Sequence, residues 1–530
     1  MPGLDGLSRD ELIALVGVQA VRIAELVAGS ESREARIAQL TAANEELAGR
    51  VAKLEHLLSR NSRNSSSPPS KDDEPGKTPP KAKRRRSGGM ERSAGKQKGA
   101  PGSHLAWSDT PDEQIDRFPH GCCGCGGDLG DAADLGVVDR YQQTEIPLVT
   151  AKVTQFDQHA VVCDCGKVHT ATRPDGARVG PVGYGPNLQA WCVFLMVVHH
   201  LPVHRCTELL ESLTGAMPSV GFVHGMLART AEALSEAHRR IRALIALAAV
   251  VVMDETPLRV GAKKPKPGRK KAEKYLLVAC TDLYTQFLLG EADLATFKAS
   301  VLKDLAAAGA VVVHDRYHVY DNDAFACDPD DPAFVGVVHQ LCTQHLARDL
   351  DDAAEVYPDE HWPTQIAEAL RGLIHHLNLA RHDATAEGHD PRYCRYCHPQ
   401  NPAPTAEELL PDFRHGVLVG LSRTQSHGTR PGERKARLLL ECLSDRPDDV
   451  LRFLTDPAVP PTSNDAEREL RPSKIQQNVS GRLTSETRTQ DRYTILGYLN
   501  TAAKHGHAKM TALRQTMLGR PWMPELPAPT

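Results

Sequence analysis

The sequence has few aromatic residues and no long apolar run. Aromatic residues make up 5% of the 530 positions, against 41% for all hydrophobic types, so the core should be mostly aliphatic. The longest apolar runs, Leu188–Val198 and Leu244–Met253, are well short of the ~20 residues that a membrane-spanning helix needs. The first residues lack the basic stretch and apolar stretch of a signal peptide. We therefore expect a cytoplasmic protein without membrane contact.

Cysteine usage and length set the next limits. The chain has 13 cysteines, and without an export signal they are expected to be thiols or metal ligands rather than disulfides. A chain of this length is too long for one core, and about two to four domains are expected. The net charge of −4 hides a cluster of basic residues near the start of the chain.

Residues 1–59 are predicted to form a helical, leucine-zipper-like coiled coil. Two sets of positions repeat every seven residues, and all but Asn44 are apolar: Ile37, Asn44, Val51 and Leu58, and Leu40, Leu47 and Leu54. A buried Asn such as Asn44 favours a two-stranded coiled coil. The alternative is a single amphipathic helix that lies on its own domain.

Residues 60–104 are predicted to be a disordered basic linker. This stretch is rich in Ser, Pro and Gly and includes Arg84, Arg85 and Arg86, and it cannot bury enough apolar surface to fold alone. A flexible cationic stretch of this kind binds nucleic-acid phosphates with little sequence preference. A solubilising linker is the alternative.

Residues 105–180 are predicted to form a zinc ribbon. The four proposed ligands are Cys122, Cys125, Cys163 and Cys165, with β-like sequence over Tyr141–Ala160 between the two pairs. Four thiolates satisfy tetrahedral Zn²⁺ and leave no position for a substrate, so this zinc would be structural. The second pair is one residue shorter than usual, and Cys123, His120 and His169 are close enough in sequence to substitute.

Residues 181–247 are predicted to be a helical, helix-turn-helix-like region. A helix over His204–Leu213, the turn TGAMP and a helix over Ser219–Leu234 have the required order. The second helix of such a unit can enter the major groove of DNA. A plain helical hairpin explains the same pattern.

Residues 248–344 are predicted to begin an α/β core. Three strands, a helix, a fourth strand, and a fifth strand with its helix follow the order of a ribonuclease H-like domain. In that fold, acids at the ends of the first and fourth strands lie side by side, and Asp254 and Asp315 are in those positions. Each could separately be an ordinary strand-end or capping residue. Arg316 and His318 are further candidates for DNA contact, or ordinary surface residues.

Residues 345–455 are predicted to be a helical insertion in this core. The insertion contains a Pro- and His-rich break with Cys394, Cys397 and His398. This segment could bind a metal or carry free thiols. Residues 456–530 are predicted to complete the core with helices.

The stretch Thr462–Gly481 carries the last candidate residues. It places three acids among three cations: Asp465, Glu467 and Glu469, and Arg468, Arg471 and Lys474. Residues two apart face nearly opposite sides of a helix, so Glu467 alone shares a face with Arg471. Glu467 could be a metal ligand, or it could complete a capping box with Asn464. Pro472 is expected to kink or end the helix, which makes Lys474 a weaker candidate for DNA contact than Arg468 or Arg471.

Several of these pieces together resemble the DDE transposases of the insertion-sequence-66 family over nearly the whole chain. They include LLSRNSRNSSSPPSKD, the Gly- and Lys-rich tract ending in GAPGSH, CGCGGDL with its later CDCG, MDETPLRV, VVVHDRYHVYD, HQLCTQHLARDL and SNDAERELRPSKIQQNVSG. The resemblance implies Asp254, Asp315 and Glu467 as a catalytic triad that holds two Mg²⁺ (or Mn²⁺) ions. The short second cysteine pair and the insertion around CRYCH depart from the family pattern.

The resemblance also implies partners and a reaction. The expected activity is cleavage of terminal inverted repeats and strand transfer into target DNA, by a nucleoid-associated homodimer or higher oligomer, with accessory proteins of the same element as further partners. Arg84, Arg85, Arg86, Arg468, Arg471 and Lys474 would contact DNA. A catalytically inactive DNA-binding regulator and a ribonuclease H-like nuclease are the alternatives.

Overall fold

The computed structural model describes residues 105–121, 124–177, 180–262, 273–331, 334–383, 404–424 and 431–526, together with residues 9, 17, 21 and 22. The chain divides into two compact units, Met1–Val149 and Thr150–Thr530. The boundary between the units falls inside the stretch predicted as the zinc ribbon. The predicted coiled coil and basic linker lie outside the described residues, apart from four positions, and stay predictions.

Within the first unit, the described stretch 105–149, with a gap at 122–123, is mostly irregular. Its one helical turn is η3 (Leu129–Asp131), where the Asp128 side chain accepts a hydrogen bond from Gly130 N–H. Ser108 and Gln142 join distant parts of this stretch through two hydrogen bonds of 2.9 and 2.7 Å.

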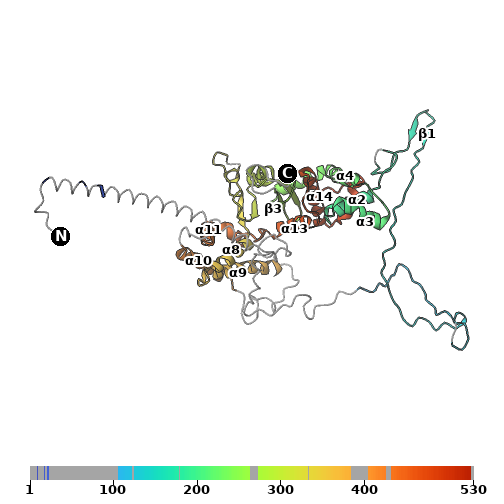
Figure 1. Cartoon of the computed structure of the whole chain (residues 1–530), viewed down its shortest axis with the longest axis horizontal. Helices are drawn as coiled ribbons and strands as arrows, with labels where there is room; N and C mark the ends of the chain where they lie inside the picture. Colours follow the sequence, from blue (N-terminus) through green and yellow to red (C-terminus); the bar gives the residue numbers. More distant parts are fainter. Residues whose placement is uncertain are drawn as a thin grey trace. The chain divides into compact units, whose positions relative to one another are not determined.

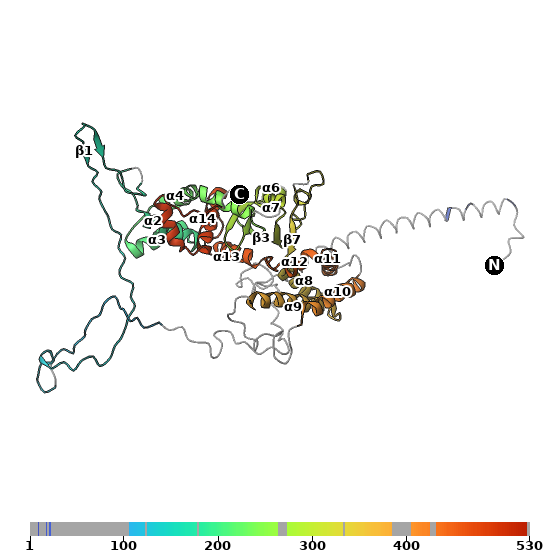
Figure 2. The ribbon, with the colours of Figure 1, turned by 180° about the vertical axis from the view of Figure 1, so that it is seen from behind.

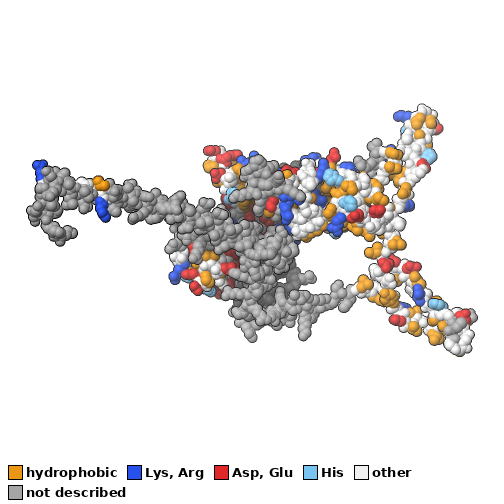
Figure 3. Space-filling model, in the orientation of Figure 1, with side chains coloured by type: hydrophobic (Ala, Val, Ile, Leu, Met, Phe, Trp, Pro, Cys, Tyr) orange, Lys and Arg blue, Asp and Glu red, His pale blue; other side chains and the backbone are white. Residues whose placement is uncertain are grey.

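The second unit begins with a short hairpin, and its position corrects one prediction. Strands β1 (Ala160–Val162) and β2 (Val168–Thr170) flank the second cysteine pair, whereas no strand occurs over residues 141–159. The apolar side chains of this stretch are exposed, including those of Val153 and Phe156. Figure 3 shows hydrophobic side chains on the surface of the extended segments outside the core. Two strands without a packed face are marginal in water, so apolar content alone was not enough to form the longer hairpin.

Four helices follow: α2 (Pro186–Val197), α3 (Val203–Thr214), α4 (Val220–Ala233) and α5 (Ser235–Ala246). Gly215 in the left-handed conformation ends α3, and the Ser219 side chain caps α4. The predicted helix-turn-helix order is therefore present. These helices share one hydrophobic cluster with the sheet described next, and α4 packs against α14 (Glu486–Lys504). They are thus built into the core.

The core is a five-stranded mixed sheet in the order β5-β4-β3-β6-β7. Its strands are β3 (Val250–Leu258), β4 (Lys274–Cys280), β5 (Thr285–Gly290), β6 (Val311–His314) and β7 (Val338–Leu341). The first three are antiparallel neighbours, and β6 and β7 run parallel to β3. Helices α6 (Leu294–Ala299) and α7 (Leu302–Ala308) lie between β5 and β6 in sequence. The five strands predicted over residues 248–344 are all present, and the single helix predicted between the third and the fourth strand is the pair α6 and α7.

The β5 edge of the sheet is covered by α14. The backbone N–H groups of Thr285 and Leu289 donate to the side chains of Thr501 and Gln490 on this helix. A Cβ at Gly497 would lie 3.0 Å from the Thr285 carbonyl oxygen, so glycine permits this close approach. Helix α14 therefore satisfies hydrogen-bonding groups that an edge strand otherwise leaves open.

The helices that follow β7 in the chain form a second hydrophobic cluster beside the β7 edge of the sheet (Figures 1 and 2). They are α8 (Thr343–Val356), α9 (Trp362–Asp383), α10 (Ala406–Arg423), α11 (Pro431–Asp445) and α12 (Pro447–Thr455). Gln340 of β7 bonds to the backbone of Val450 and Phe453, which fixes α12 against the strand. The chain then returns to the core in α13 (Asn464–Val479), α14 and α15 (Lys509–Met517). No helix in the described ranges is long and apolar enough to cross a bilayer.

Candidate active site

The two ends of the helical insertion meet at one place beside the sheet. The Thr343 N–H and hydroxyl both donate to the Pro461 carbonyl, at 3.0 and 2.8 Å. Ser463 N–H donates to the Cys342 thiol at 3.2 Å, although the two residues are 121 positions apart. The starts of α8 and α13 therefore lie together, and each brings a functional candidate to the sheet.

The predicted acids lie near one another around this point. Strands β3 and β6 pair in parallel, with Val252 opposite Val313, and Asp315 directly follows β6. Asp254 was expected at the end of its strand, but β3 continues to Leu258 because it stays paired with β4. Asp315 and Glu467 are both close enough to raise the pKa of Asp254.

Burial and nearby negative charge oppose ionisation of Asp254 and Asp315. Burial first, and then the charge of Asp315, raise the pKa of Asp254 to about 7. Burial also raises the pKa of Asp315. Within the described chain, no lysine or arginine forms an ion pair with either residue. Carboxylate oxygens are the type of ligand that a hard divalent cation prefers.

A fourth acid lies beside this cluster, and the sequence analysis did not single it out. Burial, followed by the charges of Asp315 and Asp254, raises the pKa of Glu255 to about 9. Its carboxyl group accepts a hydrogen bond from the Tyr320 hydroxyl at 3.1 Å. Glu255 is part of the motif MDETPLRV, but the sequence does not show that it is buried.

A histidine that the sequence analysis did not single out also lies beside the acids. His345 Nε2 lies 3.8 Å from Glu467 Oε1. The neighbouring Cys342 thiol raises the pKa of His345 to about 9, with further contributions from Asp315 and Asp254. His345 is therefore a cation at neutral pH. The motif HQLCTQHLARDL contains it, but only the return of the chain at α13 brings Glu467 to it.

The three acids of α13 have three different surroundings. Asp465 pairs with Arg468 at the surface, at 3.1 Å. Glu469 faces β5 and α14, and Glu467 faces His345. The capping-box alternative for Glu467 is wrong, because Ser463 is the N-cap, Asn464 lies inside the helix and no side chain caps the helix start.

Of the two outcomes expected at Pro472, a kink or the end of the helix, the second is wrong. Helix α13 continues through Pro472 to Val479, with buried residues on both sides of the proline: Ala466, Leu470, Ser473 and Gln476. Packing against β3 and β4 compensates for the lost backbone hydrogen bond. Lys474 therefore keeps its place on the Glu467–Arg471 face, at a spacing of seven residues, while Arg468 is engaged by Asp465.

Metal-binding arrangements are not formed in the described chain. No group of three His, Cys, Asp or Glu side chains there is close enough to hold a metal ion. The side chains of Cys125, Cys163 and Cys165 are exposed, and hydrogen bonds from Cys165 lower the pKa of Cys163. Cys122 lies outside the described residues, as do Arg84, Arg85 and Arg86, and the segment with Cys394, Cys397 and His398.

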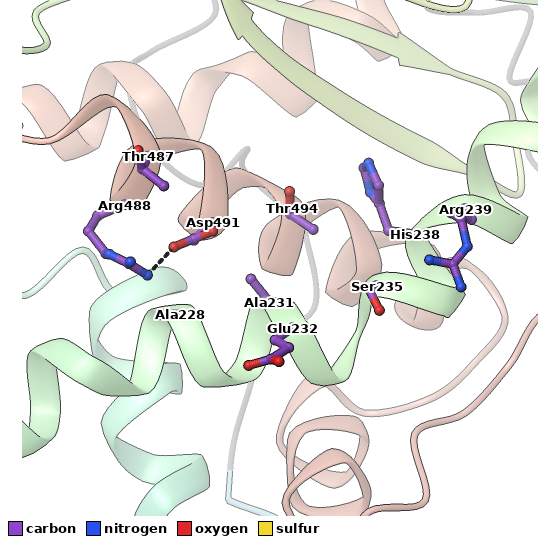
Figure 4. Close-up of a pocket in the computed structure, with 10 residues that line it drawn as sticks. All are labelled: Ala228, Ala231, Glu232, Ser235, His238, Arg239, Thr487, Arg488, Asp491 and Thr494. Atoms are coloured by element: carbon purple, nitrogen blue, oxygen red, sulfur yellow. Dashed lines mark hydrogen bonds and ion pairs between the residues drawn. The ribbon is translucent and has the colours of Figure 1, made fainter.

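A separate hollow of about 500 Å³ lies between α4–α5 and α14 (Figure 4). Two of its charged side chains have ion-pair partners: Arg488 pairs with Asp491, and Arg239 with Glu236. None of the predicted site residues lines this hollow.

Comparison with known proteins identifies the family. No curated protein matches the chain. Residues 18–106 match a family of unknown function. Residues 182–491, more than half of the chain, match the family described as "Transposase IS66 family", and this range includes all three candidate acids. The chain belongs to the IS66 family of transposases.

Proposed function

We propose that the chain is a DDE transposase that cleaves the terminal inverted repeats of its element and transfers the strand ends to target DNA. The observation that carries the proposal is the meeting of Asp254, Asp315 and Glu467 from β3, the end of β6 and α13. The sheet order, with an antiparallel trio followed by two parallel strands, supports a ribonuclease H-like core. The family match supports transposition and DNA as the substrate.

In this proposal the three acids would hold Mg²⁺ (or Mn²⁺). When bound, the metal lowers the pKa of an attacking water or 3′-hydroxyl and stabilises the leaving oxygen. His345 Nε2 lies 3.8 Å from Glu467 Oε1, so it can attract this carboxylate electrostatically when the imidazole is protonated. Glu255 lies beside Asp254 in the sequence, and burial raises its pKa to about 9.

Arg471 and Lys474 extend this face of α13 away from Glu467. Both are exposed, and neither forms an ion pair within the described residues. Cations in such positions bind DNA phosphates and set the position of the duplex without reading its sequence. We propose them as DNA contacts, ahead of Arg468, and we keep Arg84, Arg85 and Arg86 as nonspecific contacts. Structural Zn²⁺ bound by Cys122, Cys125, Cys163 and Cys165 also remains a proposal.

The test is Glu467→Gln in the full chain. Mg²⁺-dependent cleavage of DNA carrying the element's ends should be abolished, while DNA affinity stays within about twofold, because the carboxylate acts in the reaction rather than in binding. Asp465→Asn is the matched control, since Asp465 lies on the same helix and pairs only with Arg468 at the surface.

Wild-type cleavage by Glu467→Gln would show that the triad is wrongly assigned. DNA binding without cleavage by the unmutated protein would favour an inactive regulator, and cleavage of RNA–DNA hybrids alone would favour a nuclease.

A further inference from the structure

The backbone turn that follows β6 sets the direction of the Asp315 side chain. Asp315 Oδ1 accepts a hydrogen bond of 2.9 Å from Tyr317 N–H, two residues further on. Local bonds of this kind fix an aspartate to its own turn. Arg316 is the residue in the middle, so whatever holds Arg316 also holds this turn.

Arg316 is held by the helical insertion. Its guanidinium group pairs with Asp349 of α8, at 2.5 Å, and the two side chains are only 24% and 19% exposed. The other oxygen of Asp349 binds Lys435 of α11, at 2.7 Å, and Lys435 also binds Asp352, at 2.9 Å. One half-buried carboxylate thus joins α8 and α11 to the turn beside Asp315.

A second ion pair on α8 provides a comparison. Asp351 pairs with Arg371 of α9, at 2.8 Å, but its side chain is 62% exposed and its partner belongs to the insertion. Exposed pairs contribute little, because water screens them. Removing one partner of a half-buried pair costs more, because the remaining charge loses its compensation. The Arg316–Asp349 pair is therefore the stronger connection, and of these two pairs it is the one that reaches the turn after β6.

We propose that Asp349 is a positioning residue for the reaction: by holding Arg316, it fixes the turn that directs Asp315. The helical insertion thereby controls the geometry of one of the three acids without contacting DNA or metal through this residue. The inference rests on the proposed role of Asp315. It assigns a task to α8 and α11 that neither the family match nor the triad requires.

The test compares Asp349→Ala with Asp349→Glu and with the control Asp351→Ala. We expect Asp349→Ala to lower kcat for Mg²⁺-dependent DNA cleavage by about 10- to 100-fold, the effect of a small misplacement of a catalytic group, with little change in KM. Asp349→Glu, which keeps the carboxylate, should restore most of the rate, and Asp351→Ala should match the unmutated protein.

A double-mutant cycle tests whether Asp349 acts through Arg316. In an Arg316→Ala background, Asp349→Ala should have no further effect on kcat, because the contact is already gone. An equal loss in both backgrounds would overturn the proposal.

Hydrogen–deuterium exchange gives a readout that does not depend on activity. Asp349→Ala should speed exchange in the peptide that contains Asp315 and Tyr317, whereas Asp351→Ala should not. Unchanged exchange there would overturn the inference. Absent cleavage by the unmutated protein would count against the proposed function, and the exchange comparison would still decide the role of Asp349.

Discussion

His200 is a buried histidine in an unusual backbone conformation. Its φ is 59°, the one positive φ among non-glycine residues in the described chain. Its carbonyl accepts a bond from the Ser480 hydroxyl, and its Nδ1 has no hydrogen-bond partner. Burial first, then the charges of Arg492 and His199, lower the pKa of His200 to about 4. The folded chain therefore favours the neutral imidazole of His200.

This lowered pKa predicts a pH dependence of stability. Between pH 6.5 and pH 4 the unfolded chain protonates His200 and the folded chain does not, so stability is lost as pH falls through this window. The contribution is at most about 3 kcal/mol. His200→Asn, which tolerates the left-handed conformation, should lose less stability than the unmutated protein between pH 7.5 and pH 4.5 in urea unfolding.

The exposed His224 of α4 provides the control. His224→Asn should follow the unmutated protein across the whole pH range. An identical pH profile for the His200 and His224 variants would contradict the predicted role of burial.

At the scale of elements, α13 is held by the acid that faces away from the site. Glu469 accepts hydrogen bonds from Thr285 of β5, at 3.0 Å, and from Asn500 of α14. It also pairs with Lys504 of α14, at 3.1 Å, with its side chain 13% exposed. One helix thus presents Glu467 to the acid cluster and uses Glu469 to attach itself to the core.

This arrangement predicts that Glu469 contributes more to the free energy of unfolding than Asp465 does. Glu469→Ala should lower the free energy of unfolding by about 3 kcal/mol, because it leaves Lys504 without its carboxylate partner. Asp465→Ala, which removes only an exposed pair, should change it by less than about 1 kcal/mol. Chemical unfolding monitored by circular dichroism measures both, and equal effects would contradict the structural role of Glu469.

At the scale of the whole molecule, the heptads of residues 1–59 predict self-association. Light scattering of the full chain at micromolar concentration should give at least a dimer, because Asn44 and the leucine positions favour a two-stranded coil. Deleting residues 1–59 should lower the mass to that of a smaller assembly or a monomer. A monomer with and without this segment would rule out the coiled coil.

Local sequence patterns were sufficient to predict many of the helices and strands of the core. Continuous apolar runs indicated the strands β3–β7, and the turn TGAMP with Ser219 indicated the junction of α3 and α4, because these signals depend on neighbours in the sequence. The same local rules misplaced the β hairpin, the end of the strand at Asp254 and the end of the helix at Pro472. Packing decided those positions: an unpaired stretch lost its strands, and a supported helix kept its proline.

Residue chemistry and motif order led to Asp254, Asp315 and Glu467 as candidates from the sequence alone. Sequence reasoning did not find Glu255, His345 or Asp349, because their surroundings come from distant segments. Burial and the nearby charge of Asp315 raise the pKa of Glu255. The contact between Cys342 and Ser463 brings His345 close to Glu467. The sequence determined which groups the protein has, and the return of the chain from its insertion decided which of them meet.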